Sequence, residues 1–236
     1  MDTKKLYRAK PCIPQEDKPF INDAWNEILD TGMFIVRSNN IPVITDIDPV
    51  TQCINLDIIK ENVDEDTAGI MLVHMAGMLP PDYHDIKQYC EDNGLLLVED
   101  ASHAVGATID GIKAGNLGFA AAFSLFATKI ITSGEGGMIT TNNEGFAERC
   151  RVLRNHGCVR NPSIVPGLDY GVSCSVASSN YRMPEMAAAI GITQIKRADE
   201  FVAKRNLLAD RYKERLKETD IVVPDIPENI TMTWWQ

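Results

Sequence analysis

Several signatures of other protein classes are missing from this chain of 236 residues. No basic block offsets its net charge of −10, which argues against a nucleic-acid or anionic-membrane surface. No apolar run approaches the length of a membrane span, and the first residues do not have the pattern of a signal peptide. No Gly-x-Gly-x-x-Gly motif follows an expected strand, which makes a dinucleotide-binding dehydrogenase a weak alternative. We therefore expect a cytoplasmic protein without nucleic-acid or membrane partners.

Cys-x-x-Cys pairs are also missing, which bears on metal binding and redox state. Such pairs are typical of zinc sites, and dense cysteines are typical of small secreted scaffolds. The chain instead has six scattered cysteines: Cys12, Cys53, Cys90, Cys150, Cys158 and Cys174. We interpret them as reduced thiols and expect neither a disulfide framework nor a metal site.

What is present is an alternation of apolar and amphipathic segments that predicts an α/β fold. Strands are expected at Ile41–Ile47, Ala68–Met75 and Leu95–Val98, and helices at Asp57–Asn62 and Tyr83–Asn93. The order strand, helix, strand implies right-handed crossovers and a mostly parallel sheet. The apolar content of 44% and the charged content of 24% are typical of a globular protein with a buried core.

The flanking segments divide the chain into three expected parts. Residues 1–19 are polar with three prolines and predict an irregular arm, followed by a helix at Phe20–Leu29. Helices are also expected at Glu144–His156 and, as one or two helices, at Met183–Thr219, with a loop over residues 158–179 between them. We expect these parts to be an N-terminal arm and helix (1–36), an α/β domain (37–180), and a long helical segment with the start of a further domain (181–236).

One stretch of the chain places a lysine beside a glycine-rich turn. The apolar run Phe119–Phe126 predicts a fully buried strand, which carries Ser124 and leads to Lys129. The segment Ser133–Gly137 then predicts a tight turn that requires glycine. A lysine in such an apolar neighbourhood loses solvation of its ammonium form, so its pKa should fall and its amine should become a nucleophile. The alternative is that Lys129 is a solvated loop residue.

Acidic and imidazole side chains follow the buried strand at Leu95–Val98. Glu99, Asp100 and His103 come directly after it. Ligands of open α/β sheets bind beyond the carboxyl ends of the strands, so these residues are candidates for a site. The alternative is that Glu99 or Asp100 caps the N-terminus of a helix.

Three motifs occur in this order: Val98-Glu99-Asp100-Ala101-Ser102-His103-Ala104, then Ser124, Lys129 and Gly134-Glu135-Gly136-Gly137, and finally the segment from Asn180 to Gly191 (NYRMPEMAAAIG). Together they resemble the sugar aminotransferases of the DegT/DnrJ/EryC1/StrS family. The resemblance runs from about Ile41 to about Trp235, with a weaker match over Lys10–Gly32. It implies pyridoxal-phosphate enzymes with the aspartate-aminotransferase fold: a three-layer, mostly parallel sheet (fold type I) with long C-terminal helices.

The resemblance implies a role for each of five residues. Asp100 would keep the ring nitrogen of pyridoxal 5′-phosphate protonated, and Lys129 would hold its aldehyde as a Schiff base and shuttle a proton. Ser124 would contact the cofactor phosphate, and His103 would lie near the phenolic oxygen of the ring. Asn180 would reach the phosphate of the neighbouring subunit's cofactor, which implies a homodimer. For Asn180 the alternative is a cap at the entry of the following helix.

The resemblance also implies a reaction. L-glutamate would donate its amino group to the cofactor, which would then aminate a keto group of a nucleotide-linked deoxysugar for polysaccharide, lipopolysaccharide or antibiotic synthesis. A branch of the family that dehydrates its sugar has histidine in place of the lysine, so Lys129 argues against that branch.

The chain departs from the family at two places. The family's Gly-Thr loop, which cradles the phosphate, has no counterpart near Gly32–Arg37, because no Gly-Thr dipeptide occurs in the sequence. We also expect the family's C-terminal domain to be missing, since the resemblance ends near Gln236. The sequence therefore resembles an internally deleted and C-terminally truncated member with an incomplete large domain. The alternative function is that of a non-catalytic dimerisation or interaction protein.

Overall fold

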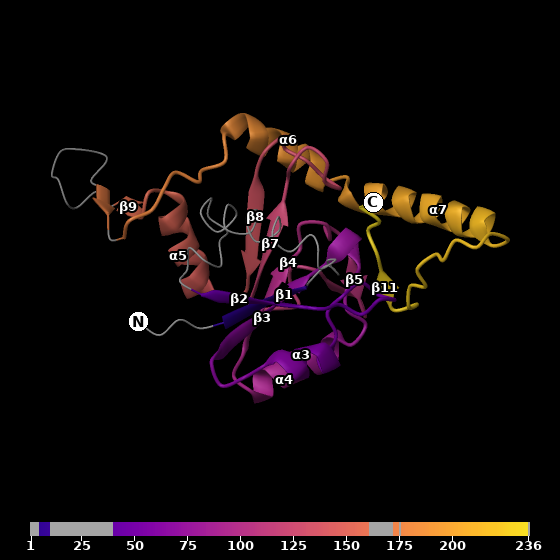
Figure 1. Cartoon of the computed structure of the whole chain (residues 1–236). Coiled ribbons are helices and arrows are strands. Elements are labelled where there is room, and N and C mark those ends of the chain that lie inside the picture. Colours follow the sequence, from indigo (N-terminus) through magenta and orange to yellow (C-terminus); the bar gives the residue numbers. More distant parts are fainter. Residues whose placement is uncertain (1–4, 10–39, 161–171, 175, 236) are drawn as a thin grey trace, which may run out of the picture.

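The computed structural model describes residues 5–9, 40–160, 172–174 and 176–235, which form a mixed α/β structure. Its main sheet has six strands in the order β2-β1-β3-β4-β7-β8. All neighbours are parallel except β7 and β8, which are antiparallel (Figure 1). The strands are β1 (Lys5–Ala9), β2 (Ile41–Thr45), β3 (Thr67–Val73), β4 (Leu96–Asp100), β7 (Ala120–Ser124) and β8 (Gly137–Thr141).

Helices lie at both ends of the sheet. Figure 1 shows α3 and α4 below it, α6 above it and α7 to its upper right. Asn55 and Asn143 cap the helices that follow them, since each side-chain oxygen accepts a backbone N–H of the first turn. No helix in the described part of the chain is long and apolar enough to cross a membrane. The helices are α3 (Leu56–Asn62), α4 (Tyr83–Asp92), α5 (Glu144–Arg154), α6 (Glu185–Ile195) and α7 (Ala198–Leu216).

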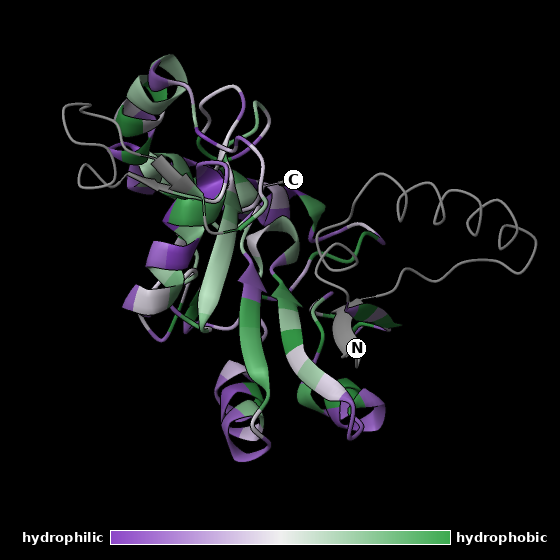
Figure 2. Cartoon of the chain, turned by 90° about the vertical axis from the view of Figure 1, so that its left-hand side faces the viewer, coloured by the Kyte–Doolittle hydropathy of each residue, from purple (hydrophilic) through white to green (hydrophobic). Residues whose placement is uncertain are grey.

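The core has two parts, and the strands at its centre are mostly hydrophobic in Figure 2. The larger cluster lies between the sheet and α3 and α4, where Ile59, Ile70, Leu72, Tyr83 and Ile86 are buried. A smaller cluster forms where α7 meets the turns after β4 and β7: Val105, Leu125, Ile130, Ile131, Ala198 and Val202. Burial of this apolar area is the main source of stability for both parts.

The central α/β prediction is confirmed, with small shifts at the ends of elements. The predicted strands at Ile41–Ile47, Ala68–Met75 and Leu95–Val98 correspond to β2, β3 and β4. The predicted C-terminal helical stretch consists of two helices, α6 and α7, which meet at Lys196 and Arg197. The predicted helix at Phe20–Leu29 lies outside the described residues.

Three structural predictions were wrong. The irregular arm over residues 1–19 contains β1, which lies between β2 and β3. The loop over residues 158–179 contains a hairpin of β9 (Cys158–Arg160) and β10 (Val172–Cys174). The run Phe119–Phe126 is not fully buried, because β7 lies next to the edge strand β8 and its Ala122 is exposed. In each case pairing with distant residues decided the outcome, which local periodicity does not report.

The prediction of reduced cysteines was wrong for one pair. Cys158 and Cys174 form a disulfide, because the antiparallel register of β9 and β10 places them directly opposite each other. Cys53 and Cys90 are free and buried, and burial raises the pKa of their thiols to about 12 and about 11. No group of three or more potential metal ligands occurs within the described ranges.

Candidate active site

The candidate site lies at the carboxyl edge of the parallel strands. Asp100 is the last residue of β4, where it pairs in register with Val73 of β3 and Ala122 of β7. Its side chain is half-buried and accepts a hydrogen bond from the Ser102 backbone N–H at 3.1 Å. A turn, not a helix, follows Asp100, so the helix-cap alternative was wrong for Asp100 and for Glu99.

Lys129 lies beside this edge and is partly buried. Burial lowers the pKa of the Lys129 amine, and the negative charge of Asp100 opposes that shift. The amine Nζ lies 4.5 Å from the centre of the Trp235 ring, a cation–π distance. The direction of the pKa shift is the one expected from the sequence, although Lys129 lies in the turns after β7 and stays partly exposed.

The side chain that the sequence did not identify is Trp235. Its ring stacks on the His103 ring with centroids 3.7 Å apart and planes 11° apart. The Trp235 Nε1–H donates to the Thr128 carbonyl at 2.9 Å, directly before Lys129. Its backbone N–H donates to the Ala76 carbonyl at 3.0 Å, and the Ala76 N–H donates to His103 Nδ1 at 3.3 Å. One indole therefore joins His103, Lys129 and the turn after β3; the two adjacent tryptophans near the end of the sequence were the only available signal.

The stacking of Trp235 on His103 makes a testable contribution to the titration of the imidazole. Burial, and then the positive charge of Lys129, lower the pKa of His103 below 6.5, and Asp100 opposes them. Replacing Trp235 with alanine should expose the ring and raise its pKa towards 6.5, which NMR titration of the His103 ring protons will measure. Trp234→Ala is the matched control, since Trp234 hydrogen-bonds Asn206 instead. An unchanged titration midpoint of His103 in Trp235→Ala would show that the Trp235 ring does not lower the pKa of His103.

Ser124 and the glycine turn complete the predicted lysine segment. Ser124 ends β7, and its Oγ accepts a hydrogen bond from the Phe126 backbone N–H at 3.3 Å. The turn is fastened to the end of β7, because the Leu125 N–H donates to the Gly136 carbonyl at 2.9 Å. Gly136 has φ +146°, and a Cβ there would lie 2.8 Å from Met183, so the prediction of a turn that requires glycine is confirmed.

A second glycine permits the C-terminal segment to approach the site. The 3₁₀ turn η2 (Met75–Gly77) ends at Gly77, which has φ +90°. A Cβ at Gly77 would lie 1.8 Å from Thr233 Oγ1 and 2.9 Å from the His103 carbonyl oxygen. These two atoms form a hydrogen bond of 2.6 Å, in which the Thr233 hydroxyl donates. Gly77 is therefore needed both for its backbone conformation and for space.

We expect Gly77→Ala to lower the free energy of unfolding by about 2–5 kcal/mol, the sum of left-handed strain and overpacking. Urea denaturation will measure this loss. Gly94→Ala is the matched control, because Gly94 also has positive φ (+64°) but nothing lies within 4 Å of its Cβ position. Equal losses in the two variants would show that the contact with Thr233 does not limit residue 77.

The fifth predicted residue, Asn180, lies apart from this group. It forms an isolated bridge with Asn155, and its side-chain oxygen accepts a hydrogen bond from the Arg182 N–H at 3.1 Å. The helix α6 begins five residues later and has no side-chain cap, so the helix-cap alternative for Asn180 was wrong. The structure thus brings together Asp100, His103 and Lys129, places Ser124 at the end of the adjacent strand, and leaves Asn180 exposed.

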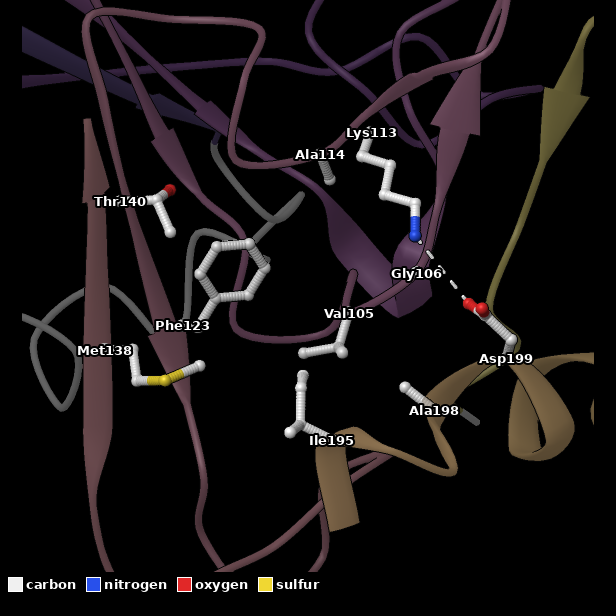
Figure 3. A pocket seen from close by; sticks show the side chains of 10 residues that line it. All are labelled: Val105, Gly106, Lys113, Ala114, Phe123, Met138, Thr140, Ile195, Ala198 and Asp199. Carbon is white, nitrogen blue, oxygen red and sulfur yellow. Dashed lines mark ion pairs between the residues drawn. The ribbon is translucent and has the colours of Figure 1, made fainter. Parts of the chain in front are cut away.

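A separate cavity of about 250 Å³ lies between β7, β8 and the junction of α6 and α7 (Figure 3). Val105, Phe123, Met138 and Ile195 give it an apolar lining. Its polar feature is the ion pair of Lys113 and Asp199, at 3.8 Å between both exposed side chains. None of the predicted site residues lines this cavity, so it is distinct from the candidate site.

Comparisons with known proteins identify the family of this chain. The sequence pattern of the DegT/DnrJ/EryC1/StrS aminotransferase family matches residues 29–236. An uncharacterized protein of Methanocaldococcus jannaschii is 36% identical over 235 residues, which cover 98% of this chain and 61% of that protein. GDP-perosamine synthase of Caulobacter vibrioides is 41% identical over 197 residues, which cover 80% of this chain and 50% of the synthase.

A solved structure gives the same answer for the fold. The aminotransferase TlmJ of Streptoalloteichus hindustanus superposes with a TM-score of 0.81 at 26% identity, over 99% of this chain and 58% of TlmJ. The chain thus spans between half and about three-fifths of the length of these relatives. From the matched pattern and the shared fold we conclude that this chain belongs to the DegT/DnrJ/EryC1/StrS aminotransferase family.

Proposed function

We propose that this chain binds pyridoxal 5′-phosphate and transfers an amino group from L-glutamate to a keto group of a nucleotide-linked deoxysugar. The observation that carries the proposal is the partly buried Lys129 amine, which has a lowered pKa and the Asp100 carboxylate as its electrostatic partner. The substrate class is supported by the similarity to GDP-perosamine synthase. The donor is the least constrained component, because a relative in Streptomyces fradiae, 32% identical, is named L-glutamine:2-deoxy-scyllo-inosose aminotransferase.

The residues at the carboxyl edge fit this cofactor. Asp100 offers a carboxylate oxygen for a protonated ring nitrogen, because the Ser102 N–H occupies only Oδ1. His103 and Ser124 would contact the phenolic oxygen and the phosphate, and Lys129 would hold the aldehyde. When bound, pyridoxal phosphate supplies an electron sink for the substrate carbon atoms.

The protein's own contribution is then proton transfer and orientation. The lowered pKa of Lys129 increases its neutral fraction at a given pH, and only the neutral amine is a nucleophile or a proton acceptor. Trp235 restricts the position of the amine from one side and hydrogen-bonds the backbone before it. We propose that this pair of contacts holds Nζ facing Asp100 throughout the reaction.

We also propose that the active unit is a homodimer. The helix α6 is apolar, yet none of its residues is buried, and Met186 is 82% exposed. Ile190, Ile192 and Ile195 on the same helix and Met138 and Ile139 on β8 are exposed as well. Exposed apolar surface of this kind typically marks a protein interface. A second copy that covers this surface would bring Asn180, just before α6, to the neighbouring site.

Absorbance and chemical trapping test the proposed function. The purified chain is mixed with pyridoxal phosphate, its visible spectrum is recorded, the complex is reduced with borohydride, and the modified peptide is mapped. We expect one adduct, on Lys129, and a spectral change when L-glutamate or L-glutamine is added before reduction. Adducts spread over exposed lysines such as Lys113 would refute the proposal.

The alternative function, a non-catalytic interaction protein, is favoured by the same exposed surface of α6 and β8. Sedimentation of the wild type and of Met186→Lys tests the interface independently of the cofactor. An interface that forms without a Lys129 adduct would support the interaction protein. A Lys129 adduct in a dimer supports the aminotransferase.

A further inference from the structure

A buried pair of a histidine and a glutamate lies directly behind the candidate site. Glu99 is 3% exposed and His74 is 1% exposed, and His74 Nε2 lies 3.0 Å from a Glu99 carboxylate oxygen. The same carboxylate accepts the backbone N–H groups of Gly115 at 2.8 Å, Leu117 at 2.8 Å and Gly118 at 2.9 Å. Four donors therefore surround a side chain that the proposed reaction does not use.

Burying the Glu99 carboxylate lowers the free energy of unfolding unless each of its lone pairs accepts a hydrogen bond. An unpaired carboxylate in a protein interior is strongly unfavourable, and four donors match its capacity. Burial acts to raise the pKa of Glu99, but the hydrogen bond and charge of His74 and the backbone N–H groups outweigh it, and the pKa is lowered. Glu99 therefore holds the turn at residues 115–118 as an ionised group.

The pair is connected to both sides of the candidate site. Glu99 precedes Asp100 on β4, and the His74 backbone N–H donates to the Asp100 carbonyl at 3.1 Å. His74 also begins the turn η2, in which the Ala76 N–H donates to His103 Nδ1. The turn at residues 115–118 leads into β7, which pairs with β4 at Asp100. Movement of the pair would thus displace both Asp100 and His103.

We propose that His74 and Glu99 are positioning residues, which fix Asp100 and His103 by tying the ends of β3 and β4 to the turn before β7. The expected effect on cofactor binding rests on the role proposed for Asp100. The expected effect on the positions of Asp100 and His103 does not. Within the described residues, His74 Nδ1 has no hydrogen-bond partner, so the link depends on Nε2 alone. This asymmetry of the ring provides a sharp test.

The test compares two amides that imitate the two nitrogen atoms of the ring. His74→Gln places a donor near the position of Nε2, whereas His74→Asn places one near the position of Nδ1. Ile86→Val, on the buried face of α4, is the control for a general loss of stability. Glu99→Gln is a further variant, and His74→Gln remains informative if Glu99→Gln does not fold.

Native-state hydrogen exchange, followed by NMR without cofactor, is the first readout. We expect exchange of the Ser102 and Ala76 amides to accelerate by about tenfold or more in His74→Asn, and to return towards the wild-type rate in His74→Gln. Ile86→Val should change the exchange rates of these two amides and of the amides of the main sheet by the same factor. Faster exchange confined to Leu117 and Gly118 would overturn the proposal, because Glu99 would then stabilise only the turn.

Selective trapping of pyridoxal phosphate on Lys129 is the second readout. We expect the fraction of adduct on Lys129 to fall in His74→Asn and to recover in His74→Gln. If the wild type forms no selective adduct, the proposed function fails, while the exchange result still decides the geometric claim. Equal trapping by the wild type and both variants would overturn the functional consequence.

Discussion

Replacing Lys129 with methionine is expected to abolish the borohydride-stable adduct and to reduce amino transfer by about 10³-fold or more, the range lost with a general acid–base group. Methionine retains an unbranched stem next to Trp235 but has no amine. Other lysines are poor substitutes; Lys113, for instance, is 65% exposed and pairs with Asp199. Its amine is therefore largely solvated.

The adduct and the rate are measured together, by peptide mapping after reduction and by single-turnover absorbance with L-glutamate. Lys113→Met is the control, and it should behave as the wild type. Lys129→Arg keeps a positive charge near Asp100 and should be as inactive as Lys129→Met, because a guanidinium does not deprotonate near neutral pH. If Lys129→Met still transfers the amino group and forms an adduct on another lysine, Lys129 is not the catalytic lysine.

Replacing Asp100 with asparagine is expected to weaken cofactor binding and, at the same time, to make the Lys129 amine more reactive. Cofactor affinity should fall by about 10- to 100-fold, because one charge-assisted hydrogen bond is worth about 1.5–3 kcal/mol. The pKa of Lys129 should fall further, because the Asp100 carboxylate raises it in the wild type. At a fixed pH, the Lys129 amine should therefore react faster with an acylating reagent while it binds the cofactor less well.

Titration with pyridoxal phosphate and the pH profile of Lys129 acylation measure these two effects. The substitution preserves the contact with the Ser102 N–H, since the amide oxygen is also an acceptor. Asp110→Asn is the control: Asp110 is exposed, binds His84 and Asn229, and should change neither quantity. A pH profile that moves upwards in Asp100→Asn would contradict the electrostatic link between the two residues.

The sequence was most informative where local pattern and chemistry agree. The strands β3 and β4 are continuous apolar runs, and the acid after β4 falls at the edge where parallel strands end. The glycine turn and Lys129 were predictable for the same reason, because a positive φ and an apolar neighbourhood are local properties. Local pattern singled out Asp100 and Lys129 separately, and only the family resemblance placed them in one site.

The remainder depends on contacts between distant residues. The stacking of Trp235 on His103 and the backbone donors around Glu99 exist only once separate turns have packed together. The disulfide of Cys158 and Cys174 follows from a hairpin that lies in a segment with no strand pattern. Composition and periodicity report which residues are apolar, but not which turns meet, so these features were not predictable.

The contacts of residues 230–235 with earlier parts of the chain also set the order in which these parts of the site meet during protein synthesis. The hydrogen bond from Thr233 to the His103 carbonyl joins residues 130 positions apart, and the Trp235 ring lies against the Lys129 amine. A ribosome makes the whole sheet long before residue 235 leaves the exit tunnel, and domains fold as their residues emerge. A nascent chain that stops before Ile230 would thus contain the six strands of the main sheet and Lys129. It would lack Trp235, the residue whose ring contacts both Lys129 and His103.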